Sequence, residues 1–349
     1  MTTLETLPTR WADLRQQQPN LRIRDAARQL GVSEAELLAT GVGKTVVRLA
    51  GDFRELLKQV TTLGHVMALT RNDALVHERK GTYENVSFNG HVGLVLGPDI
   101  DLRLFMSRWT LGFAVDENGR QSLQFFDAQG QAVHKIYLTE QSNRAAYDAL
   151  VSQFRSDDQG ETVLIEPTPD QPVDQSDEAI DVAGFQAGWL GMQDTHEFFG
   201  LLRQYGVGRQ QGLRLAPDGY AQSLTMDQVK QAMTLASDRA VPIMVFVSNP
   251  GCIQIHTGPV KKLVQMGPWY NVLDPLFNLH LNETLIGQVW LTKKPTADGI
   301  VTSLELFDKD GQNVCLLFGE RKPGKPELES WRAIVAELTS RQRPTVPTS

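Results

Sequence analysis

The chain carries one pattern twice, and this duplication constrains its fold more than any other feature. LTRNDALVHERKG at 69–81 resembles FVSNPGCIQIHTG at 246–258, displaced by 177 positions. Further along, LQFFDAQGQAV at 123–133 resembles LELFDKDGQNV at 304–314, displaced by 181. A pattern shared over this length favours duplication over chance, and two copies are too few for a solenoid. The sequence therefore predicts two similar domains.

An acidic stretch separates the two copies. Residues 156–202 contain eleven acidic side chains and no lysine or arginine. The part at 156–181 also holds three prolines, which is typical of a solvated linker. We therefore expect an N-terminal domain over 1–155, an acidic linker over 156–182 and a C-terminal domain over 183–349.

Each copy reads as helices first, then strands, then a closing helix. The strand candidates in the first copy are short and rich in Val, Phe and Leu: DALVHER, HVGLVLG, LRLFMSR, TLGFAVDE and SLQFFDAQGQAVHKIYL. They follow one another without intervening helices, which favours antiparallel pairing. The predicted fold class is α+β, with a large antiparallel β-sheet flanked by helices in each half.

Composition excludes several classes of protein. No apolar run approaches the ~20 residues needed to span a bilayer, and the first residues lack the apolar segment of a signal peptide. We therefore expect a cytoplasmic protein without membrane insertion. Only Cys252 and Cys315 occur, without a CxxC motif, and the seven histidines show no HxH or HExxH spacing. An ordinary protein-built metal site is therefore not expected.

One helix presents an unusual group of side chains. The segment QDTHEFFGLLRQYGVGRQQGLRLAP at 193–217 can begin a helix with Asp194 or Thr195 as its cap. At about 100° per residue, two faces separate: Phe198, Leu201, Leu202 and Tyr205 on one, and His196, Phe199, Gly200 and Arg203 on the other. The first face should meet the core. The second is either a solvated surface or a surface on which a ligand rests.

The first copy does not repeat this histidine. When the initial helices are aligned at a displacement of 185, Arg24 meets Arg209 and Trp11 meets His196. Any site that depends on His196 is therefore expected once per chain.

A helix-turn-helix pattern stands near the start of the chain. In IRDAARQLGVSEAELL at 23–38, Gly31 allows a tight turn and Ser33 could cap a second helix. The second helix would have to enter the major groove, yet it carries Glu34 and Glu36, which phosphates would repel. A helical pair packed on the sheet is therefore favoured over specific DNA binding.

The duplication, the acidic linker and the motifs DLRLF, QDTHEFFGLLRQYGVGRQQGLRLA and LFGERKPG resemble the bacterial hemin-degrading or hemin-transport factors of the HemS/ChuS type. The resemblance covers nearly the whole chain, including RIRDAARQLGVSEAEL. It implies a cytoplasmic protein that receives imported heme, with two similar α+β halves. It also implies one heme at the second half, under the helix that carries the histidine.

The resemblance also implies roles for individual residues. His196 matches the axial ligand to heme iron, and Arg103 of DLRLF matches the distal arginine, with Phe105 near it. The residues that match the family's pocket and propionate positions are Arg209, Phe246, Lys294 and Arg321. This chain has Cys315 and Leu316 before Arg321, where some members place polar residues.

The chemistry of these residues fits a porphyrin. Heme iron accepts an imidazole nitrogen, while the macrocycle needs flat apolar walls and cations for its two carboxylates. His196 and Phe199 could supply a ligand and a wall, and Gly200 would allow close approach. Each cation also has an ordinary structural reading: Arg209 and Lys294 as solvated charges, Arg321 as a neighbour of the closing helix, and Arg103 as a strand residue beside Asp101.

Two principal functions remain open at this point. The first is a carrier that takes heme from an inner-membrane importer and stores it or delivers it, for example to a heme oxygenase. The second is a heme-degrading enzyme with Arg103 as its distal residue, which would need an external reductant because no flavin or nicotinamide fingerprint is present. A DNA-binding regulator that uses residues 23–38 is a lesser alternative.

Overall fold

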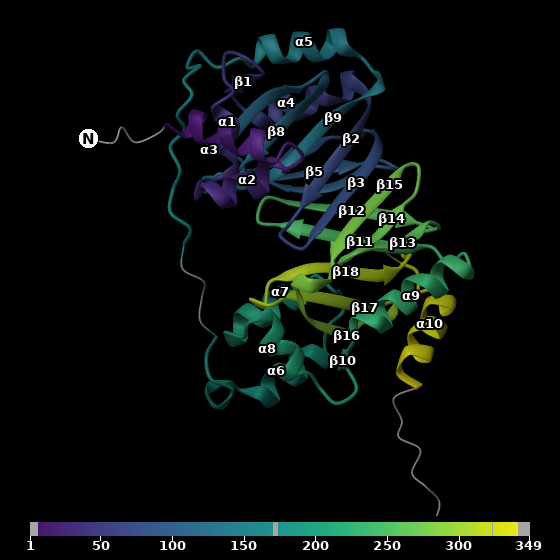
Figure 1. Ribbon diagram of the computed structural model, residues 1–349. Helices are drawn as coiled ribbons and strands as arrows, with labels where there is room; N and C mark the ends of the chain where they lie inside the picture. Colours follow the sequence, from purple (N-terminus) through teal and green to yellow (C-terminus); the bar gives the residue numbers. More distant parts are fainter. Residues whose placement is uncertain (1–5, 170–173, 323, 341–349) are drawn as a thin grey trace, which may run out of the picture. The chain divides into compact units, whose positions relative to one another are not determined.

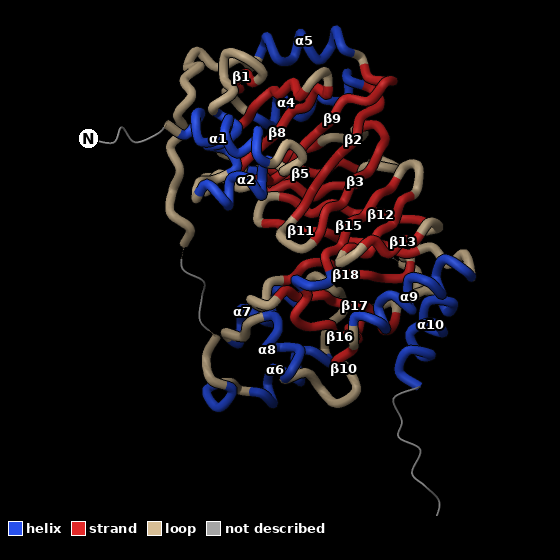
Figure 2. The backbone as a smooth tube through the Cα atoms, viewed as in Figure 1, coloured by secondary structure: helices blue, strands red, loops and turns tan. Residues whose placement is uncertain are grey.

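The two copies of the pattern fold into two similar sets of helices and antiparallel strands in the computed structural model, which describes residues 6–169, 174–322 and 324–340 (Figures 1 and 2). The expected α+β class and the internal duplication are confirmed. In each half, one short strand and one helix stand between the initial helices and the main run of strands. The sequence pattern did not predict this pair of elements, because a four-residue strand carries too little periodicity.

The first half begins with three helices and ends with one. Its elements are α1 (Leu7–Gln17), α2 (Ile23–Leu30), α3 (Glu34–Ala39), β1 (Val46–Leu49), α4 (Phe53–Gln59), β2 (Gly64–Arg71), β3 (Leu75–Thr82), β4 (Ser87–Asn89), β5 (Val92–Leu96), β6 (Asp101–Phe105), β7 (Leu111–Glu117), β8 (Arg120–Phe126), β9 (Ala132–Ser142) and α5 (Arg144–Gln153). Strands pair antiparallel in the order β1-β7-β8-β9-β2, and β4, β5 and β6 form a second antiparallel group.

The second half repeats this order. Its elements are α6 (Val182–Leu190), α7 (Glu197–Tyr205), α8 (Arg209–Arg214), β10 (Ala221–Leu224), α9 (Met226–Asp238), β11 (Ile243–Asn249), β12 (Cys252–Gly258), β13 (Leu263–Met266), β14 (Trp269–Leu273), β15 (Phe277–Asn282), β16 (Ile286–Thr296), β17 (Gly299–Asp308), β18 (Asn313–Gly319) and α10 (Glu329–Ser340). The antiparallel orders are β10-β16-β17-β18-β11 and β13-β14-β15.

The halves are not the same as the compact units of the structure. Unit 1 comprises Met1–Arg71, His77–Pro169 and Ser248–Gln254, and unit 2 comprises Asn72–Val76, Asp170–Val247 and Ile255–Ser349. Each half therefore contributes one hairpin turn to the unit that is formed mainly by the other half.

One asparagine holds the contributed turn in unit 1. The Asn249 amide donates to the carbonyl oxygens of Arg71 at 3.0 Å and Val133 at 2.8 Å. Its own carbonyl oxygen accepts the N–H groups of Gly251 and Cys252, both at 3.0 Å. Buried backbone groups need such partners, so a single side chain satisfies four of them.

Asn72 makes the matching contacts in unit 2. Its amide donates to the carbonyl oxygen of Val314 at 2.7 Å, and its carbonyl oxygen accepts the N–H groups of Ala74 and Leu75 at 3.2 and 3.0 Å. The two asparagines are displaced by 177 positions, and Val133 and Val314 by 181. The duplication read from the sequence therefore extends to individual hydrogen bonds.

Strand alternation divides the sheet of unit 2 into two faces. Leu304 and Leu306 of β17 pack in the core with α9 and α10, which lie side by side (Figure 1). Phe307 of β17 and Trp290 of β16 pack instead with the helices α6 and α7. Since side chains alternate along a strand, Glu305 is directed to the same side as Phe307.

The helix-turn-helix pattern forms α2 and α3, but α3 is packed inside the protein and is not exposed in the way that DNA binding would require. Gly31 ends α2 with a φ of 69°, and Ser33 and Glu36 form the reciprocal cap of α3. Five of the six α3 residues are buried. Glu34 is one of them and contacts Arg71 and Lys135. A packed helical pair is thus confirmed, and the charge of Glu34 is neutralised inside the unit by these two cations.

No helix within the described part of the chain is long and apolar enough to cross a membrane.

Asn249→Ala should destabilise the protein by about 2 kcal/mol, because four backbone groups lose their partner at once. Chemical denaturation gives the difference in unfolding free energy. Asn89→Ala, at an exposed position of β4, is the control and should stay within about 0.5 kcal/mol of the wild type. Equal stabilities of the two variants would contradict a structural role for the Asn249 turn.

Candidate functional site

Helix α7 separates its two faces as its periodicity predicts. Phe198, Leu201 and Leu202 are buried in one cluster, and Phe198 meets Trp189 edge-on with ring centres 4.8 Å apart. The helix begins at Glu197, slightly later than expected, so His196 stands at its N-cap position. The helix ends at Gly206, whose φ of 63° suits glycine.

His196 is directed outward and held by a carboxylate. Its side chain is 93% exposed, and its Nδ1 lies 2.6 Å from Oδ1 of Asp194. The same oxygen accepts the backbone N–H of His196 at 2.8 Å. The backbone N–H of His196 lowers the pKa of Asp194, and the imidazole and the charge of Arg321 lower it further. An ionised carboxylate can only accept a hydrogen bond, so Nδ1 is a nitrogen that carries a proton, and in the neutral ring the lone pair is then on Nε2.

The surface beside His196 is apolar and open. The Phe199 ring is 62% exposed, which is unusual for so large an apolar side chain. A Cβ added at Gly200 would meet nothing within 4 Å. The guanidinium of Arg209 lies over the Phe199 ring, 5.2 Å from its centre. An exposed ring, a small residue and a cation therefore lie next to an imidazole with a free nitrogen.

Arg209 and Lys294 are both bound to one buried carboxylate, that of Glu305. Lys294 Nζ lies 2.5 Å from Oε1 of Glu305, and Arg209 donates to Oε2 at 2.9 Å. Thr292 donates its hydroxyl to Oε1 at 3.1 Å. The Glu305 side chain is fully buried and that of Lys294 is 5% exposed, whereas Arg209 keeps 18% of its surface. Of the two cations, Arg209 is therefore the more accessible.

Glu305, Arg209 and Lys294 form a triad in which two cations share one anion, and this arrangement sets their pKa values. Burial would raise the pKa of Glu305, but Arg209 and Lys294 lower it to about 2. Burial lowers the pKa of Lys294, and the Glu305 carboxylate opposes that shift. The carboxylate is therefore ionised at neutral pH, and the triad carries a net positive charge behind α7 while all three groups are charged.

Glu305 was not among the predicted site residues, although the duplication contained a signal. At the displacement of 181, the first copy has Gln124 where the second has Glu305. A charge that replaces a neutral amide at a strand interior needs partners when it is buried. The sequence therefore distinguished Glu305 as a charge that the first copy lacks, but it did not show which cations bind it.

The remaining predicted site residues are less closely grouped. Phe246 in β11 is half-buried and meets Phe318 with ring centres 5.2 Å apart. Arg321 follows β18 and acts on Asp194 through its charge. In unit 1, Arg103 of β6 forms an ion pair with Asp101, and Phe105 ends the same strand half-buried. Of the predicted site residues, unit 2 therefore brings Phe199, Arg209 and Lys294 into one cluster around Glu305. Arg321 is close enough to Asp194 to affect its pKa.

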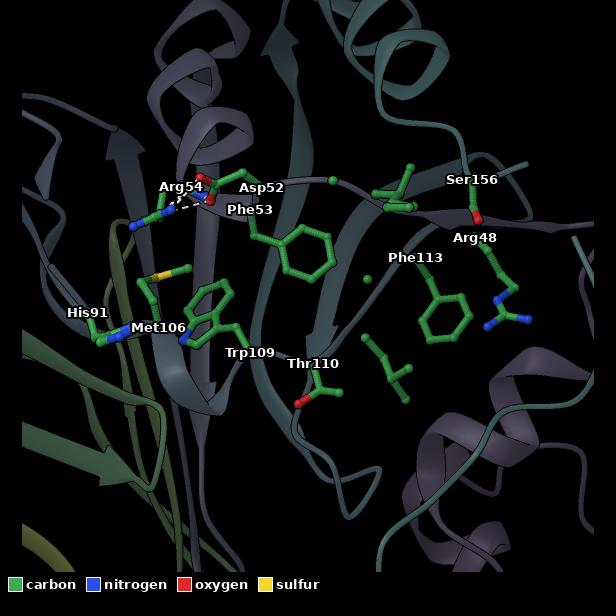
Figure 3. A pocket seen from close by; sticks show the side chains of 15 residues that line it. Arg48, Asp52, Phe53, Arg54, His91, Met106, Trp109, Thr110, Phe113 and Ser156 are labelled. Atoms are coloured by element: carbon green, nitrogen blue, oxygen red, sulfur yellow. Dashed lines mark hydrogen bonds and ion pairs between the residues drawn. The ribbon is translucent and has the colours of Figure 1, made fainter. Parts of the chain in front are cut away.

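A cavity in unit 1 is a weaker candidate. It has a volume of about 460 Å³, and Figure 3 shows Phe53, Trp109 and Phe113 among its lining side chains, with Arg48 and Arg54. Both guanidiniums are already engaged, Arg54 by Asp52 at 2.7 Å and Arg48 by Asp158 at 2.8 Å. An anionic ligand here would have to compete with these carboxylates for the charge of the guanidiniums.

The described residues contain no group of three His, Cys, Asp or Glu side chains that could hold a bare metal ion. Both cysteines are free and buried, and burial raises the pKa of each thiol to about 12. A metal held by His196 would therefore have to bring its other ligands with it, as iron does inside a porphyrin.

Glu305→Gln should destabilise the protein by about 3–5 kcal/mol in denaturant titrations at pH 7, because Lys294 stays buried without its carboxylate. The double variant Glu305→Gln, Lys294→Met removes both charges and should recover much of that loss. A single variant as stable as the wild type would contradict the triad's structural role.

The pH dependence supplies a second test of the triad. Glu305 has a pKa of about 2 in the folded protein against 4.5 ordinarily, so its stabilisation is complete above pH ~4.5 and is lost as pH falls towards ~2. The double variant should lack this part of the acid sensitivity.

Comparison with known proteins places these features in a family. The family model "Haemin-degrading HemS.ChuX domain" matches residues 31–154 and again 206–338. The hemin transport protein HemS of Yersinia enterocolitica is 42% identical over 331 residues, covering 93% of this chain and 94% of that protein.

Two solved structures extend the comparison. The heme-binding protein PhuS of Pseudomonas aeruginosa shares 46% identity with a TM-score of 0.93, over 95% of this chain and 98% of PhuS. ChuS, an Escherichia coli heme oxygenase, shares 38% identity with a TM-score of 0.86, over 96% of this chain and all of ChuS. Two matches to one model and similarity along nearly the whole chain lead to one conclusion: this protein belongs to the HemS/ChuX family of haemin-degrading and hemin-transport proteins.

Proposed function

We propose that this protein binds heme on the exposed face of α7, with His196 as the axial ligand to iron. The observation that carries this proposal is the His196 imidazole, which is 93% exposed and has its Nδ1 proton held by Asp194. The exposed Phe199 ring and the open space at Gly200 suit a flat apolar ligand. Relatives named for hemin transport and heme binding support the same ligand.

The residues of this chain would bind and orient the heme, which itself supplies the iron and the redox-active macrocycle. Nε2 of His196 would take the iron, and Phe199 would lie against the porphyrin. Arg209, Arg321 and, through the shared Glu305, Lys294 would supply positive charge for the propionates. Phe246 would line the pocket. Arg103, with Phe105 near it, would serve the distal side, where a permanently charged guanidinium suits a small polar ligand and not the metal.

We propose heme carriage as the principal role. A single protein ligand and exposed contact groups are compatible with release as well as binding. The protein would act in the cytoplasm, take heme from an inner-membrane importer and store it or pass it to an acceptor such as a heme oxygenase. Its relative HemS is named a hemin transport protein, which supports this role.

The second candidate is heme degradation, with Arg103 as the distal residue. It is favoured by the similarity to ChuS, which is a heme oxygenase. The DNA-binding alternative gains no support, because most of α3 is buried.

His196→Ala should remove the axial ligand. The absorption spectrum of the heme complex should then become that of a water-ligated heme that is bound less tightly. Binding should survive in part, because burial of the porphyrin contributes ~25 cal/mol per Å² without the iron bond. His91→Ala removes another exposed histidine and should leave the spectrum unchanged at one heme per chain. An unchanged spectrum in His196→Ala would eliminate this residue as the ligand.

Single-turnover spectroscopy separates the carrier from the enzyme. The heme complex is reduced in air with catalase present, and the Soret band is followed. A carrier keeps the band, and the heme then transfers to an added heme oxygenase. Loss of the band with a tetrapyrrole product would establish degradation instead, and Arg103→Ala should then slow that loss.

A further inference from the structure

We propose that Asp194 is the positioning residue for the iron ligand: its carboxylate keeps the proton on Nδ1 of His196, so that Nε2 faces the metal, and it increases electron donation from the imidazole. This inference rests on the proposed heme site. It assigns a role in tuning the iron to a residue that would otherwise only hold the turn before the helix.

The geometry carries the first step. A single oxygen, Oδ1 of Asp194, accepts both the backbone N–H of His196 at 2.8 Å and its ring Nδ1–H at 2.6 Å. Because both hydrogen bonds end on Oδ1 of Asp194, the turn that precedes α7 fixes the orientation of the imidazole ring. The imidazole is therefore held in one tautomer and one orientation before any ligand arrives, which reduces the entropy lost on binding.

The turn has a second, independent support. Oε2 of Glu197 accepts the backbone N–H of Gln193 at 2.9 Å, and Glu197 is the first residue of the helix. This carboxylate carries the same charge and lies on the same turn, but it accepts a hydrogen bond from the backbone, whereas that of Asp194 also binds the imidazole. The chain thus contains a matched control for Asp194.

The effect should grow when a ligand binds. The Asp194 side chain is 59% exposed in the free protein, where water competes for its hydrogen bonds. A porphyrin that covers His196 would exclude part of that water and strengthen the bond between carboxylate and imidazole. A carboxylate partner raises the basicity of a ligating histidine, and greater donation stabilises ferric over ferrous iron.

A purely structural role for Asp194 predicts something different. If the carboxylate only caps the turn, Asp194→Asn should behave like the wild type once bound, because asparagine caps helices equally well. The asparagine side-chain oxygen can still accept the hydrogen bond from Nδ1–H, but it is neutral and increases electron donation from the ring less than a carboxylate does. The substitution therefore separates capping from tuning.

The test compares Asp194→Asn with Glu197→Gln in the full-length protein. In the free protein, nitrogen NMR of His196 should show a smaller Nδ1–H fraction in Asp194→Asn and no change in Glu197→Gln. In the heme complex, Asp194→Asn should shift the iron–histidine stretching frequency down and the reduction potential up. Heme affinity should fall by about tenfold.

Two outcomes remain distinguishable. Identical tautomer, stretching frequency and potential in Asp194→Asn and Glu197→Gln would overturn the role of Asp194, even if His196 binds iron. An unchanged spectrum in His196→Ala would instead overturn the proposed heme ligand. Because the tautomer measurement uses the free protein, it tests Asp194 without depending on bound heme.

Discussion

The side-chain amides of Asn72 and Asn249 join each contributed hairpin turn to strands of the unit that it completes. Each asparagine reaches a backbone carbonyl of a strand that lies far away in sequence, Val314 for Asn72 and Val133 for Asn249. Backbone groups at these positions have to be paired, so neither unit is complete with its own half of the chain alone. A cut in the acidic linker would therefore separate the halves without separating two finished domains.

The site on α7 depends on how the sheet of unit 2 distributes its side chains. One face of β16 and β17 carries leucines towards α9 and α10, while the other carries Glu305 and Phe307 towards the helices that include α7. The buried face of α7 occupies this second side, so His196 and Phe199 are left outside. The cations bound by Glu305 place positive charge behind an exposed apolar helix face, which suits an apolar ligand with carboxylates.

Much of this arrangement could be predicted from residue patterns. The spacing of Phe198, Leu201 and Leu202 assigned the buried face of α7, and the repeat assigned two similar α+β halves. The Gly31 turn and the Ser33 cap correctly predicted α2 and α3. Burial of Glu34 could not be predicted, because its two cationic partners, Arg71 and Lys135, are 37 and 101 positions away in the chain.

The sequence by itself determined the duplication, the α+β class and the outward face of α7, because these follow from local periodicity and direct comparison of two segments. Only the tertiary structure decided that Arg209 and Lys294 share Glu305, and that each hairpin turn belongs to the opposite unit. The reason is physical: a buried charge or backbone carbonyl is satisfied by whichever group the fold brings within ~3 Å, and a linear pattern does not encode that proximity.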